Sequence, residues 1–325
     1  MHPRTNWGGH FVLTGILAGI TWALETVILG FALSLSPFIS NEVAVALAPF
    51  VSTFLHDAAS AVIMWLTCAV RGKGKELFSA FRSKEMKWLV LASAIGGPCG
   101  MTGYVLAVNY MGASVGAIAS AIYPAIGSVL AFLFLKEKVR WYQWIFLCLT
   151  IAGVFGISFS PDIDISNFWL GLLGAFMCAF GWGIEGVILS KCMKDNSIKS
   201  EYALTVRQSV SALIYGIIIL PVLGGWNFAA KLFVGKNSKA LLFVFLAAFF
   251  ATVSYLLYYK TIANLGVAKA MGLNITYTAW ALVFSVAIFS DFSLLNPITV
   301  GCGIGVVVCG FLSATDLKEL FDKKK

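Results

Sequence analysis

The sequence predicts an all-α membrane protein with ten transmembrane helices arranged as two inverted five-helix repeats. Of its 325 residues, 59% are hydrophobic and 12% are charged, whereas a soluble domain has about 25% charged residues. The apolar residues form runs close to the roughly 20 residues that a helix needs to cross a bilayer. In addition, residue spacings in the first half of the chain recur in the second half. The composition excludes a water-soluble globule, and the short connections exclude a separate soluble domain.

Apolar runs bounded by turn residues and charged residues predict the helices in chain order. We expect them over residues 11–34, 42–70, 87–111, 113–136, 140–159, 168–193, 200–224, 240–263, 266–290 and 296–315. The first run is longer than the apolar region of a signal peptide and no small-residue cleavage site follows it, so we expect this helix to remain in the mature protein. Within the third helix, Pro98 lacks the N–H group that would continue the helix, which predicts a kink or an unwound turn.

Lys and Arg residues gather in alternate connections between the predicted helices. They follow the second helix (Arg71, Lys73, Lys75, Arg82, Lys84 and Lys87), the fourth (Lys136, Lys138 and Arg140) and the sixth (Lys191, Lys194 and Lys199), and three lysines end the chain. The connections after the first, third, fifth and ninth helices contain neither residue type, whereas three lysines after the seventh depart from the pattern. Because basic residues accumulate in cytoplasmic loops, we expect both termini in the cytoplasm. The compact loops and the absence of organelle signals favour a bacterial plasma (inner) membrane. The formal charge of +8 then reflects orientation, and no nucleic-acid partner is expected.

The two halves of the chain share residue types at matching positions. The first and sixth helices share one spacing pattern, Trp22, Glu25, Val27, Ile28 and Leu29 against Trp182, Glu185, Val187, Ile188 and Leu189. The fourth and ninth share another, Gly112, Tyr123 and Glu137 against Gly266, Tyr277 and Asp291. We expect two repeats, residues 1–160 and 161–325, that form one transport domain. Because five is odd, the second repeat enters the membrane in the opposite orientation, which predicts alternating access around a site near the bilayer midplane.

Ionisable side chains fall near the centres of several predicted helices. Glu25, Asp57 and Glu185 lie in the first, second and sixth helices, where a charge costs about 2.5–3.5 kcal/mol on insertion scales. His56 and Arg207 occupy corresponding places in the two repeats, and Arg207 is the expected internal partner of the acids. One hypothesis is a structural charge cluster that ties the halves together, and the other is a binding site. Three acids against one Arg leave an excess of negative charge, which favours a cation or a proton over an anionic substrate.

Aromatic residues accompany these acids. Trp22 and Trp182 precede Glu25 and Glu185 by three residues, so each indole shares a helix face with a carboxylate. The further candidate substrate-binding residues are Tyr123 in the fourth helix, Tyr255 and Tyr258 in the eighth, and Asn274, Tyr277 and Trp280 in the ninth. A quaternary ammonium group has no N–H to donate and is recognised by aromatic faces, each contact contributing about 0.5–2 kcal/mol. A flat aromatic substrate could stack on the same rings, so the residues leave both alternatives open.

Motifs for catalysis and for cofactors are missing from the sequence. It contains no phosphate-binding loop, no catalytic triad and no cluster of metal ligands. The seven cysteines lie in or beside apolar runs and show no CxxC spacing. We therefore expect no enzyme activity, no metal and no cofactor. A membrane-embedded enzyme or scaffold without transport activity is the alternative from another class of protein.

Several runs of residues carry a resemblance to a known family. The ten helices, the repeat and the acid-bearing ends of the fourth and ninth helices (Leu135–Lys136–Glu137 and Phe289–Ser290–Asp291) resemble the EamA-like branch of the drug/metabolite transporter superfamily. More narrowly, the chain is similar to bacterial choline transporters of the LicB type in His56–Asp57, Gly97–Met101, Ser120–Ala125, Phe180–Glu185, Arg207–Gln208, Ala268–Ala270 and Gly272–Asn274. The resemblance implies choline uptake with Glu185 as the counter-charge of the ammonium group. It places six aromatic residues around that group: Trp22, Trp182, Tyr255, Tyr258, Tyr277 and Trp280.

Together these inferences predict a secondary transporter that imports choline, or a closely related quaternary amine, across the plasma membrane by alternating access. The alternative is a proton-coupled exporter of amino acids, metabolites or drugs, in which Glu25 or Glu185 exchanges protons. The coupling stays open as well. An inside-negative potential supplies about 2.3 kcal/mol per charge per 100 mV, and proton symport through the carboxylates is equally compatible with the sequence.

Overall fold

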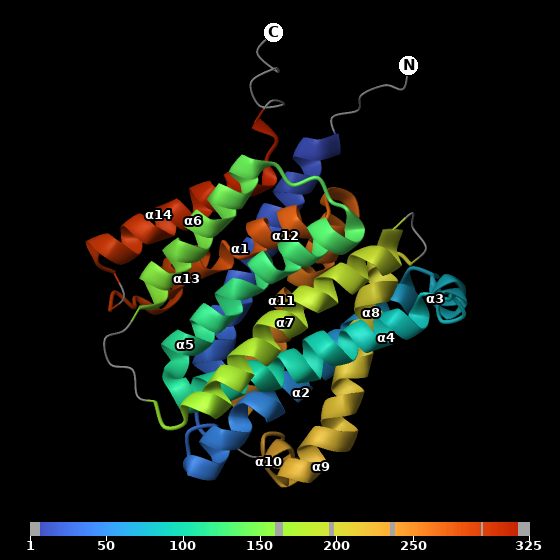
Figure 1. The fold of residues 1–325 in the computed structure, drawn as a ribbon. Coiled ribbons are helices and arrows are strands. Elements are labelled where there is room, and N and C mark those ends of the chain that lie inside the picture. The colour runs from blue at the N-terminus through green and yellow to red at the C-terminus, as the bar shows by residue number, and fades with distance from the viewer. Residues whose placement is uncertain (1–6, 160–164, 195–197, 235–237, 294, 318–325) are drawn as a thin grey trace.

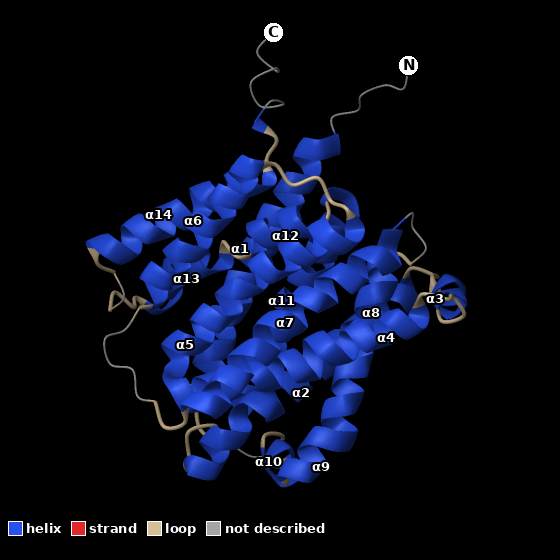
Figure 2. Cartoon of the chain, viewed as in Figure 1, coloured by secondary structure: helices blue, strands red, loops and turns tan. Residues whose placement is uncertain are grey.

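The computed structural model describes residues 7–159, 165–194, 198–234, 238–293 and 295–317. The described chain is helical and contains no strand (Figures 1 and 2). Its elements are α1 (Trp7–Leu33), α2 (Glu42–Val70), α3 (Gly74–Ala80), α4 (Met86–Ala94), η1 (Ile95–Cys99), α5 (Gly100–Leu130), η2 (Ala131–Leu135), α6 (Trp141–Ser158), α7 (Phe168–Met193), α8 (Ser200–Ile214), η4 (Tyr215–Ile219), α9 (Leu220–Leu223), α10 (Trp226–Lys231), α11 (Ser238–Leu265), α12 (Val267–Asn274), α13 (Tyr277–Phe289) and α14 (Pro297–Ala314). The elements labelled η are single π-helical turns that continue a neighbouring α-helix.

Ten stretches of helix within the described residues are long and apolar enough to cross a membrane. They are His10–Leu33, Glu42–Val70, Met86–Gly112, Gly116–Leu135, Trp141–Ser158, Phe168–Met193, Ser200–Leu223, Lys239–Leu265, Val267–Phe289 and Pro297–Ala314, numbered below as spans 1 to 10. All ten predicted helices are thereby confirmed, and each end lies within three residues of its predicted position. Large apolar side chains such as Val70, Trp141 and Val222 are exposed on the outer surface, as expected of a protein that faces lipid.

The backbone carries the predicted repeat. Gly112 and Gly266 have φ angles of 85° and 88° where span 3 meets span 4 and where span 8 meets span 9. Lys136 and Ser290 have φ angles of 55° and 53° at the ends of spans 4 and 9. In both pairs the second residue follows the first by the same 154 residues, so the two halves bend at equivalent positions. The chain is an all-α membrane protein of two inverted five-helix repeats.

The helix packing follows the same symmetry. Helix α1 of the first repeat packs against α11 of the second, and α7 of the second repeat packs against α5 of the first. These are equivalent pairs, because span 1 corresponds to span 6 and span 8 to span 3. Two further contacts join equivalent helices, α2 with α8 and α6 with α14. Spans 1 and 6, which carry the repeated Trp and Glu residues, are thereby held against the other repeat in the middle of the bundle (Figure 1).

Span 3 is interrupted where the sequence predicts a kink or an unwound turn. Pro98 lies within η1, a π-helical turn between α4 and α5. A proline cannot donate to the helical ladder, and the wider turn accommodates its ring. The prediction of an interruption at this position is confirmed. The backbone carbonyl of Gly96, which lies in this turn, takes part in the site described below.

Ion pairs join connections at the end of the bundle where most basic residues gather. Lys73 Nζ lies 2.6 Å from Glu201 Oε1 and Lys199 Nζ lies 2.5 Å from Glu76 Oε2. The hydroxyl of Tyr202 donates to the same Glu76 oxygen over 2.7 Å. The hydrogen bonds from Lys199 and Tyr202 hold the pKa of Glu76 below its ordinary value. Helix α3 is thereby fastened to the start of α8.

Candidate functional site

Two small cavities lie side by side in the middle of the bundle. The first, the aromatic cavity, measures about 70 Å³ and is lined by Trp22, Tyr123, Trp182, Glu185, Gly186, Leu189, Tyr255, Tyr258, Tyr259, Asn274 and Tyr277. The second, the polar cavity, measures about 60 Å³ and is lined by Trp22, Glu25, Leu29, Thr53, His56, Asp57, Gly96, Gly97, Met101, Trp182, Arg207 and Tyr255. Trp22, Trp182 and Tyr255 line both cavities and form the wall between them.

The walls of the aromatic cavity are rings packed edge to face. The ring centroids of Trp22 and Tyr255 are 4.7 Å apart at an interplanar angle of 82°. Those of Tyr123 and Trp182 are 5.7 Å apart at 89°, and Tyr277 lies 6.2 Å from Trp22. Edge-to-face contacts of this kind are an arrangement that aromatic pairs prefer. Trp22 and Trp182 are repeat-equivalent residues, so each half of the molecule contributes one indole.

Trp182 is held in position by the interrupted helix of span 3. Its indole N–H donates to the carbonyl oxygen of Gly96 over 2.9 Å. Tyr104, one turn beyond η1, stacks on the indole with ring centroids 6.1 Å apart and an interplanar angle of 25°. A Cβ atom built on Gly100 would lie 2.8 Å from the Trp182 ring, so only glycine leaves room for it. The π-helical turn η1 therefore fixes the orientation of Trp182, one of the rings that line the aromatic cavity.

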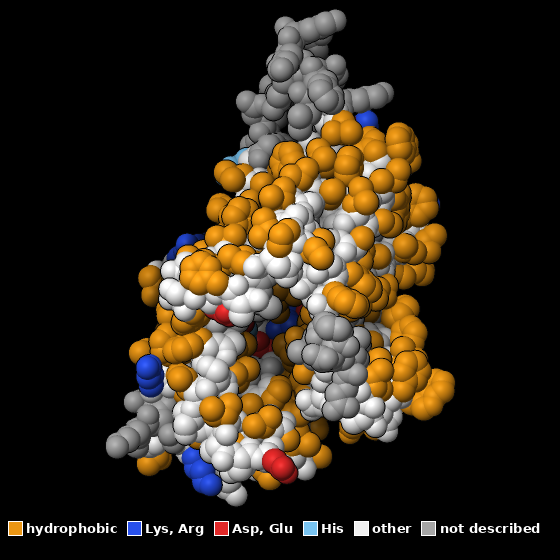
Figure 3. Space-filling view, turned by 90° about the vertical axis from the view of Figure 1, so that its left-hand side faces the viewer, with side chains coloured by type: hydrophobic (Ala, Val, Ile, Leu, Met, Phe, Trp, Pro, Cys, Tyr) orange, Lys and Arg blue, Asp and Glu red, His pale blue; other side chains and the backbone are white. Residues whose placement is uncertain are grey.

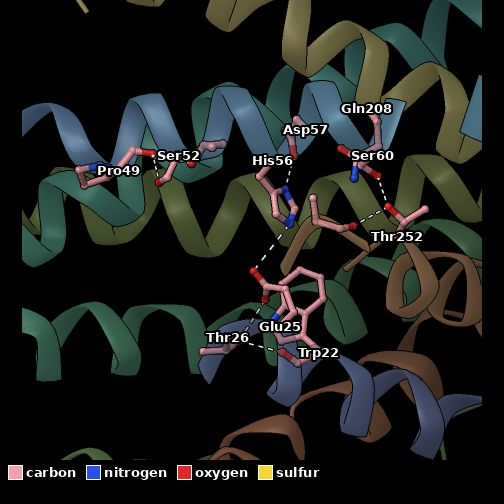
Figure 4. A network of polar contacts seen from close by, with 12 residues as sticks. Trp22, Glu25, Thr26, Pro49, Ser52, His56, Asp57, Ser60, Gln208 and Thr252 are labelled. Carbon is pink, nitrogen blue, oxygen red and sulfur yellow. Dashed lines mark hydrogen bonds and ion pairs between the residues drawn. The ribbon is translucent and has the colours of Figure 1, made fainter. Parts of the chain in front are cut away.

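A chain of ionisable side chains runs through the polar cavity and joins the two repeats. Glu185 Oε1 accepts a hydrogen bond from Arg207 Nε over 3.1 Å, and Arg207 Nη1 donates to Asp57 Oδ2 over 3.3 Å. Asp57 Oδ1 lies 2.9 Å from His56 Nδ1. His56 Nε2 faces Glu25 Oε1 at 3.7 Å, which is longer than a hydrogen bond (Figure 4). Glu25 and Glu185, the repeat-equivalent acids, thus form the two ends of one chain.

Arg207 also contacts the wall between the cavities. Its Nη1 atom donates to Gln208 Oε1 over 2.8 Å. Its guanidinium carbon lies 4.9 Å from the ring centroid of Tyr255, the distance of a cation–π contact. Arg207 therefore contacts both the acids of the polar cavity and a ring of the aromatic cavity.

With its three carboxyl groups ionised, the chain of ionisable groups carries a net negative charge. All five of its side chains are buried, with exposed fractions of 2–7%. Three ionised carboxylates against the guanidinium of Arg207 leave two negative charges, and protonation of His56 leaves one. A buried net charge is costly in a membrane interior unless a counter-ion or a proton offsets it. The arrangement can therefore hold a cation and disfavours an anion.

The sequence-predicted site residues divide between the two cavities, with one exception. Eight line the aromatic cavity: Trp22, Tyr123, Trp182, Glu185, Tyr255, Tyr258, Asn274 and Tyr277. Glu25, His56, Asp57 and Arg207 line the polar cavity. Trp280 lies apart from both, in an apolar groove between α13 and α14. On α13, Tyr277 contacts Trp22 of α1, whereas Trp280 faces the groove beside α14.

Sequence reasoning missed the contribution of span 3. Gly96, Gly97 and Met101 line the polar cavity, and Tyr104 supports Trp182. The only signal in the sequence is the Gly–Gly–Pro run, which predicts an interruption but not which helix packs against it. A Cβ atom on Gly96 would clash with the carboxylate of Glu185, so the glycine lets α7 approach closely.

One face of the molecule is hollowed. Figure 3, which views the left-hand side of Figure 1, shows a recess with acidic and basic side chains visible at its floor. The connection between α13 and α14 lies on this side (Figure 1). Apolar side chains cover much of the surface around the recess. The recess therefore leads from this side of the molecule to charged groups in the interior of the bundle.

Comparisons with known proteins agree with this architecture. Residues 10–159 match the model of the EamA-like transporter family. The chain is 28% identical over 290 residues to Protein LicB of Haemophilus influenzae, covering 88% of this chain and 91% of that protein. A solved crystal structure shares the fold with a TM-score of 0.68 at 18% identity, covering 94% of this chain and 97% of that one. The first half of the chain thus resembles the EamA-like transporter family and most of the chain resembles LicB, and both similarities support a multi-pass membrane transporter.

Proposed function

We propose that the protein imports choline, or a closely related quaternary amine, across the bacterial plasma membrane by alternating access. The observation that carries the proposal is an aromatic cavity built beside a buried cluster of three carboxyl groups and one arginine. A quaternary ammonium ion needs this combination, because it carries a diffuse positive charge and no N–H group.

The rings supply the first requirement. Trp22, Trp182, Tyr123 and Tyr277 come from four different helices and surround one small space. Each cation–π contact with a desolvated cation contributes about 0.5–2 kcal/mol, so several rings together bind an ammonium group without hydrogen bonds.

Glu185 supplies the second requirement. It lines the aromatic cavity, and its carboxylate is also the last member of the ionisable chain. The cation is therefore held near a negative charge that Arg207 offsets only in part. A substrate with a carboxylate of its own, such as an amino acid, would place that group against the same net negative cluster.

Alternating access requires the site to open to each side of the membrane in turn. In the proposal, residues 1–160 and 161–325 move relative to each other around the site, with both termini in the cytoplasm. The membrane potential draws the cation inward.

Uptake into proteoliposomes tests this proposal. We expect purified protein to accumulate labelled choline when the lumen is negative, and unlabelled choline to compete with it. Wild-type protein that exchanges labelled amino acids and ignores choline would support the exporter alternative and refute the proposal. The control variant is Trp169→Ala, which alters an exposed indole at the start of α7, far from the cavities, and should transport normally.

A further inference from the structure

We propose that Asn274 recognises a hydroxyl group on the substrate, an inference that rests on the proposed function and extends it. Asn274 is the last residue of α12, is 5% exposed and lines the aromatic cavity. Its Nδ2 atom donates to the hydroxyl of Tyr123 over 3.0 Å. Its Oδ1 atom is buried and has no hydrogen-bond partner within the described part of the chain.

A buried amide oxygen without a donor is unfavourable, and a ligand that brings a donor corrects this. The cavity wall offers rings for the ammonium group and a single amide with an unused atom. A hydroxyl group both donates and accepts, so it pairs with Asn274 whichever way the amide is turned. An anionic group in the same place would face the carboxylate of Glu185. The substrate class is therefore a quaternary amine with a neutral hydroxyl.

The equivalent position in the first repeat has no unused polar atom. Ser120 stands in the first half where Asn274 stands in the second, 154 residues earlier. The Ser120 hydroxyl already donates to the carbonyl of Ala117 over 2.7 Å. Only the second repeat therefore presents an unused polar atom at this position, and Ser120→Ala serves as the control.

The test is competition binding of choline against propyltrimethylammonium, in which a methyl group replaces the hydroxyl. We expect the wild-type protein to prefer choline about tenfold or more. Asn274→Leu should remove that preference, so that choline and propyltrimethylammonium bind with equal affinity, whereas a general loss of structure would abolish the binding of both amines. Ser120→Ala should keep the preference. Asn274→Asp, which retains an acceptor, should keep it as well and covers the case in which the leucine variant fails to fold.

Two outcomes would overturn the role of Asn274 and leave the proposed function standing. One is a wild-type protein that binds both amines equally. The other is a preference for choline that survives in Asn274→Leu. If neither amine binds to the wild-type protein, the proposed function itself is wrong, and the inference falls with it.

A second, independent inference concerns two equivalent acids at helix ends. We infer that Glu137 and Asp291 are alternating gate contacts, each engaged in one of the two access states. Glu137 accepts hydrogen bonds from the backbone N–H groups of Val267 and Ala268 over 2.8 and 3.2 Å. A Cβ atom built on Gly266 would lie 2.7 Å from the same carboxylate. Glu137 therefore caps the N-terminus of α12 and fastens span 4 of one repeat to span 9 of the other.

Asp291 is the repeat equivalent of Glu137 and is disengaged. It is exposed, and the hydrogen bonds it accepts come from the backbone N–H and the hydroxyl of Ser293 in its own loop. Gly112 is the equivalent of Gly266, and a Cβ atom built on it would meet no atom of the described residues within 4 Å. The recess in Figure 3 opens on the side of the connection that holds Asp291. The structure thus shows the contact between the acid and the helix N-terminus formed for Glu137 and not formed for Asp291.

An inverted-repeat transporter changes access by exchanging the conformations of its two halves. In the opposite state Asp291 would cap the helix that follows Gly112, and Glu137 would release α12. The neutral variant Glu137→Gln weakens the interaction with the helix N-terminus, which is expected to change the ratio of the two states about two- to fivefold.

Distances between spin labels test this inference. Labels attached at Lys138→Cys and Ala263→Cys, in a chain without its native cysteines, report opening at the Glu137 end. We expect Glu137→Gln to enlarge the population with the longer distance, and Asp291→Asn to reduce it. An unchanged distribution in Glu137→Gln, or a shift in the same direction in both variants, would overturn the gate. Choline is absent from the measurement, so the result does not depend on the substrate.

Discussion

Replacing Gly96 by alanine gives a direct measure of how the site is assembled. A Cβ atom at this position would clash with the carboxylate of Glu185, so we expect that carboxylate to move and to lose its 3.1 Å bond with Arg207. A hydrogen bond to a charged group contributes about 1.5–3 kcal/mol, whereas alanine in a helix is favoured over glycine by about 0.5–1 kcal/mol. The net effect is a loss of about 1–2 kcal/mol of stability and, because Glu185 is the proposed counter-charge, about a tenfold loss of choline affinity.

Thermal unfolding and calorimetric choline titration of Gly96→Ala measure both quantities. The matched control is Gly305→Ala in α14, where a new Cβ atom meets nothing within 4 Å and stability should not fall. A Gly96→Ala protein that melts like wild type and binds choline with wild-type affinity would refute the packing of Glu185 against span 3.

Four further outcomes are expected. Trp182→Ala should abolish choline uptake in proteoliposomes while folded protein remains in the membrane, and Trp182→Phe, which keeps an aromatic face, should retain part of it. Arg207→Leu should lower the unfolding free energy by about 3–5 kcal/mol in denaturant titrations, because it leaves buried carboxylates unpaired. Trp280→Ala should leave choline affinity unchanged in calorimetry, since its side chain lies outside both cavities. The lowered pKa of Glu76 stabilises the fold above its unfolded-state pKa; this contribution is lost as pH falls through the folded value, and melting curves of Glu76→Gln should lack that acid dependence.

The sequence predicted the helices and the repeat because both depend on local patterns. Bilayer thickness fixes the length of each apolar run, and five helices per half require the inversion. The spacing of Trp22 with Glu25, and of Trp182 with Glu185, was also sufficient to place ring and acid on a common helix face. These features need no knowledge of which helices touch.

The division of the site into two cavities could not be predicted in this way. It depends on the rotation of each helix about its axis and on its partners, which the interruption at Pro98 sets for span 3. His56 shows the difference, because one ring nitrogen contacts its neighbour Asp57 and the other faces Glu25 on a different helix. Trp280 shows the converse, since its three-residue spacing from Tyr277 suggested a shared site and the packing of α13 against α14 separates them. Tyr104 has no sequence signal at all.

Calorimetric binding of the purified protein to choline, betaine, carnitine and a panel of amino acids tests the central claim most directly. The account predicts saturable binding of choline, weaker binding of the two amines that carry a carboxylate, and no binding of amino acids. Binding of an amino acid in preference to every quaternary amine would contradict it.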